Sequence, residues 1–382
     1  MQMSEGVKQM GALGIIFSDI HSWNVAEMTA NRTVASIPFG GRYRLVDFLL
    51  SNMVNSGIYK VGLITKSNYQ SLIDHIASGK EWDLSRKHGG IVVLPPYGIG
   101  NNAGPYKGRL DALKRIKRFI ESATQEYVVL ADCDVVANMD YSEIIRQHIK
   151  TKADITAVYS VKELTSQQAQ HSIIYNSIDE NKRITDILLY PEKEGKMPVS
   201  LNVWVMSKER LLYLISDAAA HGLNHFSKNI LLDNVSRMKI MGYEHTGYSA
   251  HIESLTGYME SNMDLINREN RTKLFGIEGQ PIHTKVRDSA PTKYSSDAVV
   301  KNSLIADGCV IEGTVENSIL FRGVKVSKGA VVKNSILMQD TLIENGASLS
   351  WIICDKNVIV RDNRVLSADK SYPFYISKSK MI

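Results

Sequence analysis

The sequence predicts an α/β protein in which a doubly wound, mostly parallel, Rossmann-like domain precedes a parallel β-helix domain. In the first two thirds of the chain, short apolar runs alternate with amphipathic helical patterns, which is typical of a parallel sheet covered by helices. After about Gln280 the helical periodicity stops, and short apolar triplets recur at nearly constant spacing. Such self-similar repeats are typical of a β-helix, whose coils consist of three short strands separated by turns.

The first domain should begin with a buried strand at residues 11–18, which read GALGIIFS. An amphipathic helix is expected at residues 48–57, because the apolar spacing is helical and Gly57 is a residue type that commonly ends helices. Further strands are predicted at 59–65, 126–136 and 153–161, and further helices at 110–123 and 142–152. Ligands bind beyond the carboxyl ends of the strands in such sheets, so residues 18 and 132–134 should lie at the rim of a site.

The C-terminal repeat carries a short motif in which Asn or Ser, then Ser or Trp, precede two Leu or Ile residues. The motif begins at Asn302, Asn317, Asn334 and Ser350, at intervals of 15, 17 and 16 residues. An antiparallel sandwich is the alternative, but the self-similar spacing and the small turn residues favour a β-helix. We therefore assign residues 1–267 to the first domain, 268–294 to a proline-containing linker and 295–382 to the β-helix.

The composition argues against two classes of function. The chain has 382 residues, 44% of them hydrophobic and 22% charged, with a net charge of +5. The basic residues are dispersed, whereas a nucleic-acid-binding protein usually gathers them in a stripe. No apolar run reaches the length of a membrane span, and we expect no membrane association. The three cysteines show neither paired nor metal-type spacing, so we expect reduced thiols and a cytoplasmic protein.

Several long segments resemble the bacterial ADP-glucose pyrophosphorylase (glucose-1-phosphate adenylyltransferase) family, in the same order along the chain. They are residues 31–57 (NRTVASIPFGGRYRLVDFLLSNMVNSG), 82–84 (WDL), 89–97 (GGIVVLPPY), 138–141 (NMDY) and 257–262 (GYMESN). The resemblance implies a left-handed β-helix and the synthesis of ADP-glucose from ATP and glucose 1-phosphate. That reaction uses Mg²⁺, which two aspartates from separate segments would hold.

The phosphate-binding loop departs from the family pattern. The family has a glycine-rich loop of the form A-G-G-x-G-T-R-L, where residues 18–25 here read SDIHSWNV. Backbone N–H groups of glycines approach phosphates closely, whereas Ile20 and Trp23 would fill that space and Asp19 would add negative charge. His21 is a candidate substitute for the lost arginine, although a neutral imidazole replaces it poorly. Val34 stands where the resemblance implies a phosphate-contacting lysine.

The metal positions are only partly kept. The resemblance places the first ligand at Asp134, with Asp132 as a register-shifted alternative, and replaces the second aspartate by His251. Imidazole is a weak ligand for Mg²⁺, and Glu253 would lie too far along its strand to compensate.

The sugar-phosphate segment is also altered, since Tyr190 stands where the resemblance implies a phosphate-pairing lysine, and Lys193 just downstream is a candidate shifted substitute. In the family's G-T-A-D-A segment Asp111 is kept, but Arg109 is larger than expected.

The resemblance also implies an effector site between the two domains, where Arg32 and Arg44 would bind a phosphorylated effector through their planar guanidinium groups. For Arg44 an ion pair with Asp47 is an equal alternative.

Together these features resemble a GlgD-type regulatory subunit. The resemblance implies that such a subunit binds no cofactor tightly and forms a heterotetramer with a catalytic homologue. The catalytic homologue would use the Mg²⁺. The alternative is an active sugar-phosphate nucleotidyltransferase with a remodelled site. An acyltransferase interpretation, based on the β-helix alone, leaves the N-terminal domain unexplained.

Overall fold

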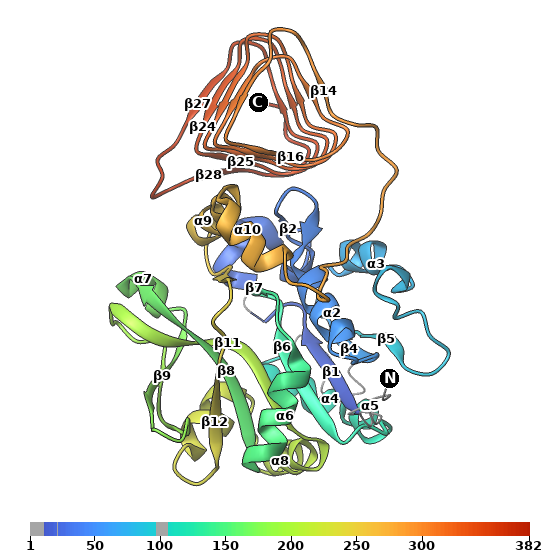
Figure 1. Cartoon of the computed structure of the whole chain (residues 1–382), viewed down its shortest axis with the longest axis vertical. Coiled ribbons are helices and arrows are strands. Elements are labelled where there is room, and N and C mark those ends of the chain that lie inside the picture. Colours follow the sequence, from blue (N-terminus) through green and yellow to red (C-terminus); the bar gives the residue numbers. More distant parts are fainter. Residues whose placement is uncertain (1–10, 21, 97–105) are drawn as a thin grey trace, which may run out of the picture.

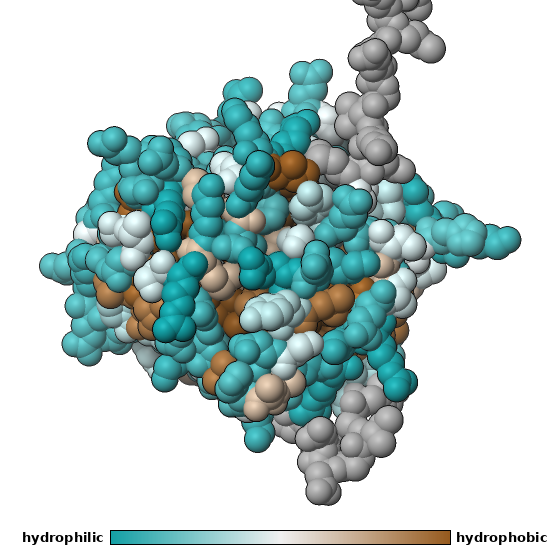
Figure 2. All heavy atoms as spheres, turned by 90° about the horizontal axis from the view of Figure 1, so that it is seen from below, coloured by the Kyte–Doolittle hydropathy of each residue, from teal (hydrophilic) through white to brown (hydrophobic). Residues whose placement is uncertain are grey.

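The structure is a computed structural model that describes residues 11–20, 22–96 and 106–382. A triangular β-helix lies at one end of the molecule, over an α/β domain formed by the first two thirds of the chain (Figure 1). The face of the α/β domain that lies opposite the β-helix is mainly hydrophilic, with apolar residues in smaller patches (Figure 2). Among the described helices, none is both long and apolar enough to cross a bilayer.

The central sheet has a parallel half, which contains the first strand. The order of these strands in the sheet is β5-β4-β1-β6, and every neighbouring pair is parallel. Their bounds are Gly90–Leu94 for β5, Lys60–Ile64 for β4, Ala12–Phe17 for β1 and Tyr127–Asp132 for β6. All six residues of β1 are buried, as expected for a strand covered on both faces. This half confirms the expected Rossmann-like domain.

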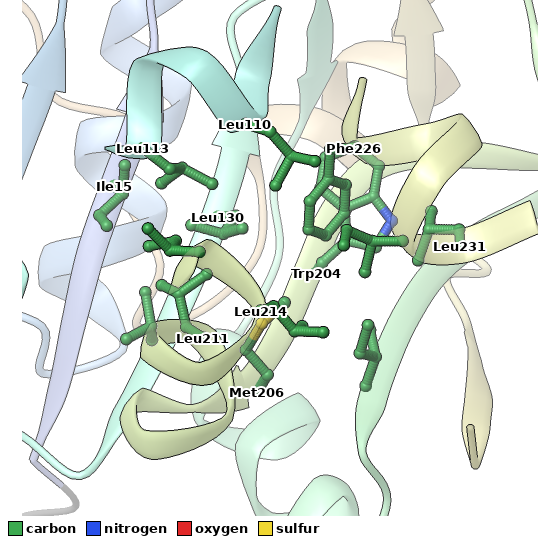
Figure 3. Packing of buried hydrophobic residues seen from close by; sticks show 14 of the residues in the cluster. Ile15, Leu110, Leu113, Leu130, Trp204, Met206, Leu211, Leu214, Phe226 and Leu231 are labelled. Atoms are coloured by element: carbon green, nitrogen blue, oxygen red, sulfur yellow. The ribbon is translucent and has the colours of Figure 1, made fainter. Parts of the chain in front are cut away.

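Helices cover both faces of this half. On one face Leu13 and Ile15 pack with α4 (Arg109–Arg115), α5 (Lys117–Glu121) and α8 (Lys208–Ala220), and part of this cluster is drawn in Figure 3. On the other face Ile16 packs with α2 (Leu45–Asn55) and α6 (Tyr141–Thr151). The helix expected at 110–123 is two helices, because the chain leaves helical geometry at Ile116.

The other half of the sheet is built around one long strand, β11 (Gly195–Ser207), and mixes directions. β11 is antiparallel to β6, to β8 (Ile155–Leu164) and to β9 (Ile173–Ile178). β10 (Ile184–Leu189) is antiparallel to β9, whereas β12 (Ile240–Glu244) is parallel to β8. The helix–strand rhythm did not reveal these antiparallel neighbours. A small separate antiparallel sheet joins β7 (Val135–Ala137) to β13 (Ser249–His251) and brings β13 close to the end of β6.

The segment between the domains starts as a helix. α9 (Leu255–Met263) and α10 (Arg268–Phe275) precede an irregular stretch at 276–292. That stretch is fixed to the first domain, because the Asn138 side chain donates to the carbonyl oxygens of Leu274 and Gln280, both at 2.9 Å.

The β-helix has three five-stranded sheets, each of them parallel. The first contains β14 (Lys293–Tyr294), β17 (Val310–Ile311), β20 (Lys325–Val326), β23 (Leu342–Ile343) and β26 (Ile359–Val360). The second contains β15 (Val299–Lys301), β18 (Thr314–Glu316), β21 (Val331–Lys333), β24 (Ser348–Ser350) and β27 (Val365–Ser367). The third contains β16 (Leu304–Ile305), β19 (Ile319–Leu320), β22 (Ile336–Leu337), β25 (Ile352–Cys354) and β28 (Phe374–Ile376). This arrangement confirms the predicted left-handed β-helix.

One corner of the β-helix is a ladder of residues in left-handed backbone conformation. Asn302, Asn317 and Asn334 have φ of 43°, 45° and 46°. Asparagine tolerates this conformation better than other residues with a side chain. In the fourth repeat the corner residue is Trp351, with φ of 59°, and not Ser350, from which the sequence motif was counted.

An apolar cluster joins the two domains. It contains Phe39, Tyr258 and Leu265 from the first domain and Ile319 and Ile336 from the β-helix. The buried contact fixes the orientation of the β-helix on the α/β domain and forms a cleft between them.

Candidate functional site

The residues at the predicted rim of the site, Ser18, Asp132 and Asp134, line a small space at the ends of β1 and β6. A larger cavity lies next to it, near the ends of β1 and β4, where Ile20 and Lys66 contribute to the lining. It has a volume of about 660 Å³. Aromatic and basic side chains predominate in its lining, among them Trp23, Lys66, Tyr106, Lys107, Arg109, Tyr190, Phe226 and Lys228. Phe226 packs on Trp204 beneath the cavity, with ring centroids 5.1 Å apart (Figure 3). The cavity suits an anionic ligand with an apolar or aromatic part.

The segment that replaces the glycine-rich loop folds as a 3-10 helix, Ser22–Val25, followed by α1 (Ala26–Thr29). Trp23 is 65% exposed and lies at the cavity, with the Lys66 ammonium 5.9 Å from its ring centroid. Ile20 also lines the cavity, whereas His21 lies outside the described residues. Side chains therefore occupy the place where backbone N–H groups would cradle phosphates.

Asp19 holds the next segment of the chain. It is buried, and its carboxylate accepts a hydrogen bond from the backbone N–H of Val34 at 3.2 Å. Burial raises the pKa of Asp19, and the hydrogen bond from Val34 opposes that rise. Val34 itself is buried and presents no cation to a ligand.

Asp132, the alternative metal position, is the partner of Arg109. Arg109 is 6% exposed and Asp132 is 2% exposed. The Arg109 Nε atom donates to both carboxylate oxygens, at 3.1 and 3.0 Å, and Nη2 also donates to Oδ2. This two-point contact is the strong form of an arginine–carboxylate pair.

Asp134 follows two residues later and is held by Asn202 of β11. The Asn202 amide donates to its two carboxylate oxygens at 3.3 and 3.2 Å. Burial, and next the charge of Asp132, raise the pKa of Asp134 to about 7. The backbone carbonyl of Asp134 accepts from the Ile252 N–H at 2.8 Å, so His251 lies on the neighbouring strand.

His251 supplies no negative charge to a Mg²⁺ ion near Asp134, and an imidazole nitrogen is a poor ligand for that hard cation. Burial, and next the charge of Lys162, hold the pKa of His251 well below its usual value, so the ring is neutral. Its Nε2 atom is buried and accepts no hydrogen bond from the described residues. Within residues 11–20, 22–96 and 106–382, no three His, Cys, Asp or Glu side chains are arranged to hold a metal ion. The residues present therefore do not fit the Mg²⁺ site that the family implies.

The candidate substitutes lie elsewhere. Glu253 lines a separate cavity of about 340 Å³ together with Lys162, Glu260 and Asp264. Burial raises the pKa of Glu253 to about 8, so it does not supply a full charge at neutral pH. The Lys193 ammonium donates to the Asn176 side chain at 3.0 Å on the exposed surface and is not among the residues that line the large cavity.

The two expected effector arginines have different surroundings. Arg32 is 5% exposed and forms an ion pair with Asp355 of the β-helix, which is 2% exposed and also accepts from the Tyr375 hydroxyl at 2.6 Å. Arg44 lines a narrow cleft between the domains and donates to the Ser71 carbonyl and hydroxyl at 2.5 and 3.0 Å. Its contact with Asp47 is made through the backbone N–H, at 3.0 Å.

The cleft gathers cations that are scattered in the sequence. Its basic residues are Arg42, Arg44, Lys285, Arg287, Arg322 and Lys356, and no acidic residue lines it among those described. Burial and the nearby cations Arg44 and Arg32 lower the pKa of Lys356 to about 7. Sequence reasoning found Arg44 but missed its neighbour Arg42 and the other four, which come from three further parts of the chain. It also missed Asn202 and the pairing of Arg109.

Comparison with known proteins finds two family matches and several full-length or nearly full-length relatives. Residues 25–271 match the nucleotidyl transferase family, and residues 289–378 match the GlmU-like C-terminal hexapeptide family. The glycogen biosynthesis protein GlgD of Bacillus subtilis (strain 168) is 33% identical over 366 residues, which cover 96% of this chain and 95% of that protein. GlgD of Geobacillus stearothermophilus is 36% identical over 84% of this chain and 82% of its own length.

The glucose-1-phosphate adenylyltransferase of Geobacillus stearothermophilus is 35% identical over 80% of this chain and 78% of that protein. Both types of relative therefore match most of this chain. Because the likeness extends over almost the full length of both chains, this protein belongs to the nucleotidyl transferase family, in the group that contains GlgD proteins and glucose-1-phosphate adenylyltransferases.

Proposed function

We propose that this protein is a regulatory, catalytically weakened subunit of a glucose-1-phosphate adenylyltransferase and acts in glycogen biosynthesis. It would form a heterotetramer with a catalytic homologue in the cytoplasm and change that homologue's rate, substrate affinity or effector response. The likeness to proteins named for glycogen biosynthesis supports the process. The altered site supports the regulatory role.

One observation carries the catalytic part of the proposal. The carboxylates at the end of β6 are engaged by protein groups, Asp132 by Arg109 and Asp134 by Asn202. Nucleotidyl transfer needs cations placed at the developing charge on the phosphates, which here would require a metal site and a phosphate loop. Since these contacts act together on one transition state, their joint loss should lower the rate by many orders of magnitude.

We further propose that the cleft containing Arg44 binds a phosphorylated effector. Six basic side chains surround it, and a polyvalent anion would relieve their mutual repulsion. Arg32 would stabilise this site without contacting the effector, because its ion pair with Asp355 connects the α/β domain to the β-helix next to Lys356. A bound anion would thereby change how the two domains are held together.

The decisive experiment measures ADP-glucose formation, with Mg²⁺, by the purified chain alone, by the catalytic homologue alone and by the two mixed. We expect no turnover by the chain alone and an altered rate or substrate affinity in the mixture. An equal mass of an unrelated protein, added to the catalytic homologue, controls for nonspecific stabilisation. Robust turnover by the chain alone would favour the alternative function, an active nucleotidyltransferase with a remodelled site.

A further inference from the structure

Arg109 is fixed in place by the start of α4. A Cβ atom on Gly108 would lie 2.4 Å from the carbonyl oxygen of Asn224, so only glycine fits there. The Leu110 N–H donates to that same oxygen at 3.2 Å. The backbone on both sides of Arg109 is therefore held against the 224–227 segment.

The guanidinium is anchored on several sides. Besides its contacts to Asp132, Nη1 donates to the Ser227 hydroxyl at 3.4 Å, and the group lies 5.2 Å from the centroid of the Trp204 ring. Trp204 is fully buried, and an arginine over its ring gains a cation–π contact in addition to the ion pair. Arg109 thus behaves as part of the interior and not as a mobile surface cation.

The Arg109 guanidinium lies where it can control access to the carboxylates at the end of β6. Arg109 lines the 660 Å³ cavity, while Asp132 and Asp134 line a separate, much smaller space with Asp19. The guanidinium therefore lies between the carboxylates and the cavity in which a substrate would sit. Two buried carboxylates so close in sequence need a nearby positive charge, and Arg109 supplies one that is always protonated.

We propose that Arg109 is a built-in cation that takes the place of a divalent metal at the end of β6 and closes these carboxylates to Mg²⁺. This inference rests on the proposed catalytic weakening and gives it a cause. A metal could reach Asp132 only by displacing the guanidinium, which would cost a buried arginine its ion pair with that carboxylate. The site is blocked by an added cation and not merely by lost ligands.

Removal of the arginine tests this directly. In Arg109→Ala, the Asp132 carboxylate loses its ion pair with the guanidinium, and we expect a lower midpoint of thermal unfolding. Millimolar Mn²⁺ should raise that midpoint and should bind at least tenfold more tightly to the variant than to the unaltered chain. The free Mn²⁺ signal in electron paramagnetic resonance measures the binding on the full-length protein, without any assay of activity.

Two matched variants test whether a gain in Mn²⁺ affinity comes from the exposed Asp132 carboxylate or from the loss of any arginine. Arg115→Ala removes an arginine of the same helix that pairs with Asp111 at 3.1 Å, and it should gain no affinity for Mn²⁺. Arg109→Ala combined with Asp132→Asn leaves no unpaired charge at Asp132, so it should fold but bind Mn²⁺ no better than the unaltered chain. If Arg109→Ala is insoluble, the same test applies to protein refolded with Mn²⁺ or with ethylguanidinium, which can fill the vacated space.

The proposal is overturned if the unaltered chain binds Mn²⁺ at Asp134, as judged by loss of binding in Asp134→Asn. It is also overturned if folded Arg109→Ala gains no affinity, or if no cation restores folding of that variant. None of these outcomes depends on turnover. Failure of the proposed regulatory function would instead appear as ADP-glucose synthesis by the chain alone.

Discussion

Two charged regions of this protein are arranged in opposite ways. At the end of β6 each acidic side chain faces a protein partner, as Asp132 faces Arg109 and Asp134 faces Asn202. In the cleft between the domains, cations face one another, and the pKa of Lys356 falls to about 7 through burial and the charges of Arg44 and Arg32. In the first region each carboxylate has a partner, whereas the second brings six cations together with no acidic residue in the described lining, although Arg322 pairs with Asp307 outside the cleft.

This difference between the two regions indicates that the charges at the end of β6 stabilise the fold, whereas those in the cleft serve to bind an anion. A buried charge with a complete set of partners stabilises the fold only as long as both partners remain. A group of like charges costs stability until an ion of opposite charge binds. We therefore expect changes in the first region to alter stability, and changes in the basic cleft to alter anion binding.

The largest effect is expected at the ion pair that connects the domains. Asp355→Ala leaves the Arg32 guanidinium buried without its partner and should lower the free energy of unfolding by roughly 3–5 kcal/mol. Urea denaturation followed by fluorescence measures this change. Asp355→Leu combined with Arg32→Met should recover most of the loss, because no unpaired charge remains. A loss below about 1 kcal/mol in the single variant would show that Arg32 is free to serve a ligand.

In the basic cleft, removal of a charge should weaken anion binding and leave the stability of the fold nearly unchanged. Arg287→Ala removes an exposed cation that lines the cleft, so sulfate affinity should fall about tenfold, equivalent to about 1.4 kcal/mol. The free energy of unfolding should change by less than about 1 kcal/mol. Isothermal titration calorimetry with sulfate provides the measurement. Lys325→Ala, at an exposed position outside the cleft, is the control and should leave the affinity unchanged.

Anion binding to the cleft should also weaken as the pH rises. The folded pKa of Lys356 is about 7, well below its usual value of 10.5, so the side chain loses its charge above neutrality. A bound anion favours the charged form, and binding therefore takes up a proton near pH 7. Sulfate affinity should fall several-fold between about pH 6 and 8 and should change much less in Lys356→Met. An affinity that is flat with pH in the unaltered chain would remove Lys356 from the site.

The smallest effect is expected at the retained aspartate. Asp134→Asn should change the rate of a mixture with the catalytic homologue by less than about twofold, because we propose that no chemistry occurs on this chain. ADP-glucose formation by the mixture, compared with one containing the unaltered chain, measures it. A large loss of rate would place catalysis on this subunit and contradict the contrast between the two regions.

Local patterns in the sequence were sufficient to predict many of the helices and strands. The run 11–18 predicted β1, and the repeats after Gln280 predicted the β-helix. The antiparallel neighbours of β11 escaped prediction because their pairing depends on chain direction, which an apolar pattern does not record. The break at Ile116 and the corner at Trp351 escaped because boundaries depend on packing.

The sequence by itself predicted which phosphate-binding and metal-binding groups this protein lacks, because its differences from the family pattern are read residue by residue at Asp19, Ile20, Val34, Tyr190 and His251. Only the tertiary structure decided what the remaining charges do. It paired Arg32 with a carboxylate 323 residues away, directed the Arg44 side chain to Ser71 and placed Arg109 on Asp132. The physical reason is that the contribution of a charge to stability or binding depends on its burial and on its partners. Both are set by residues that are distant in the sequence and meet only in the folded chain.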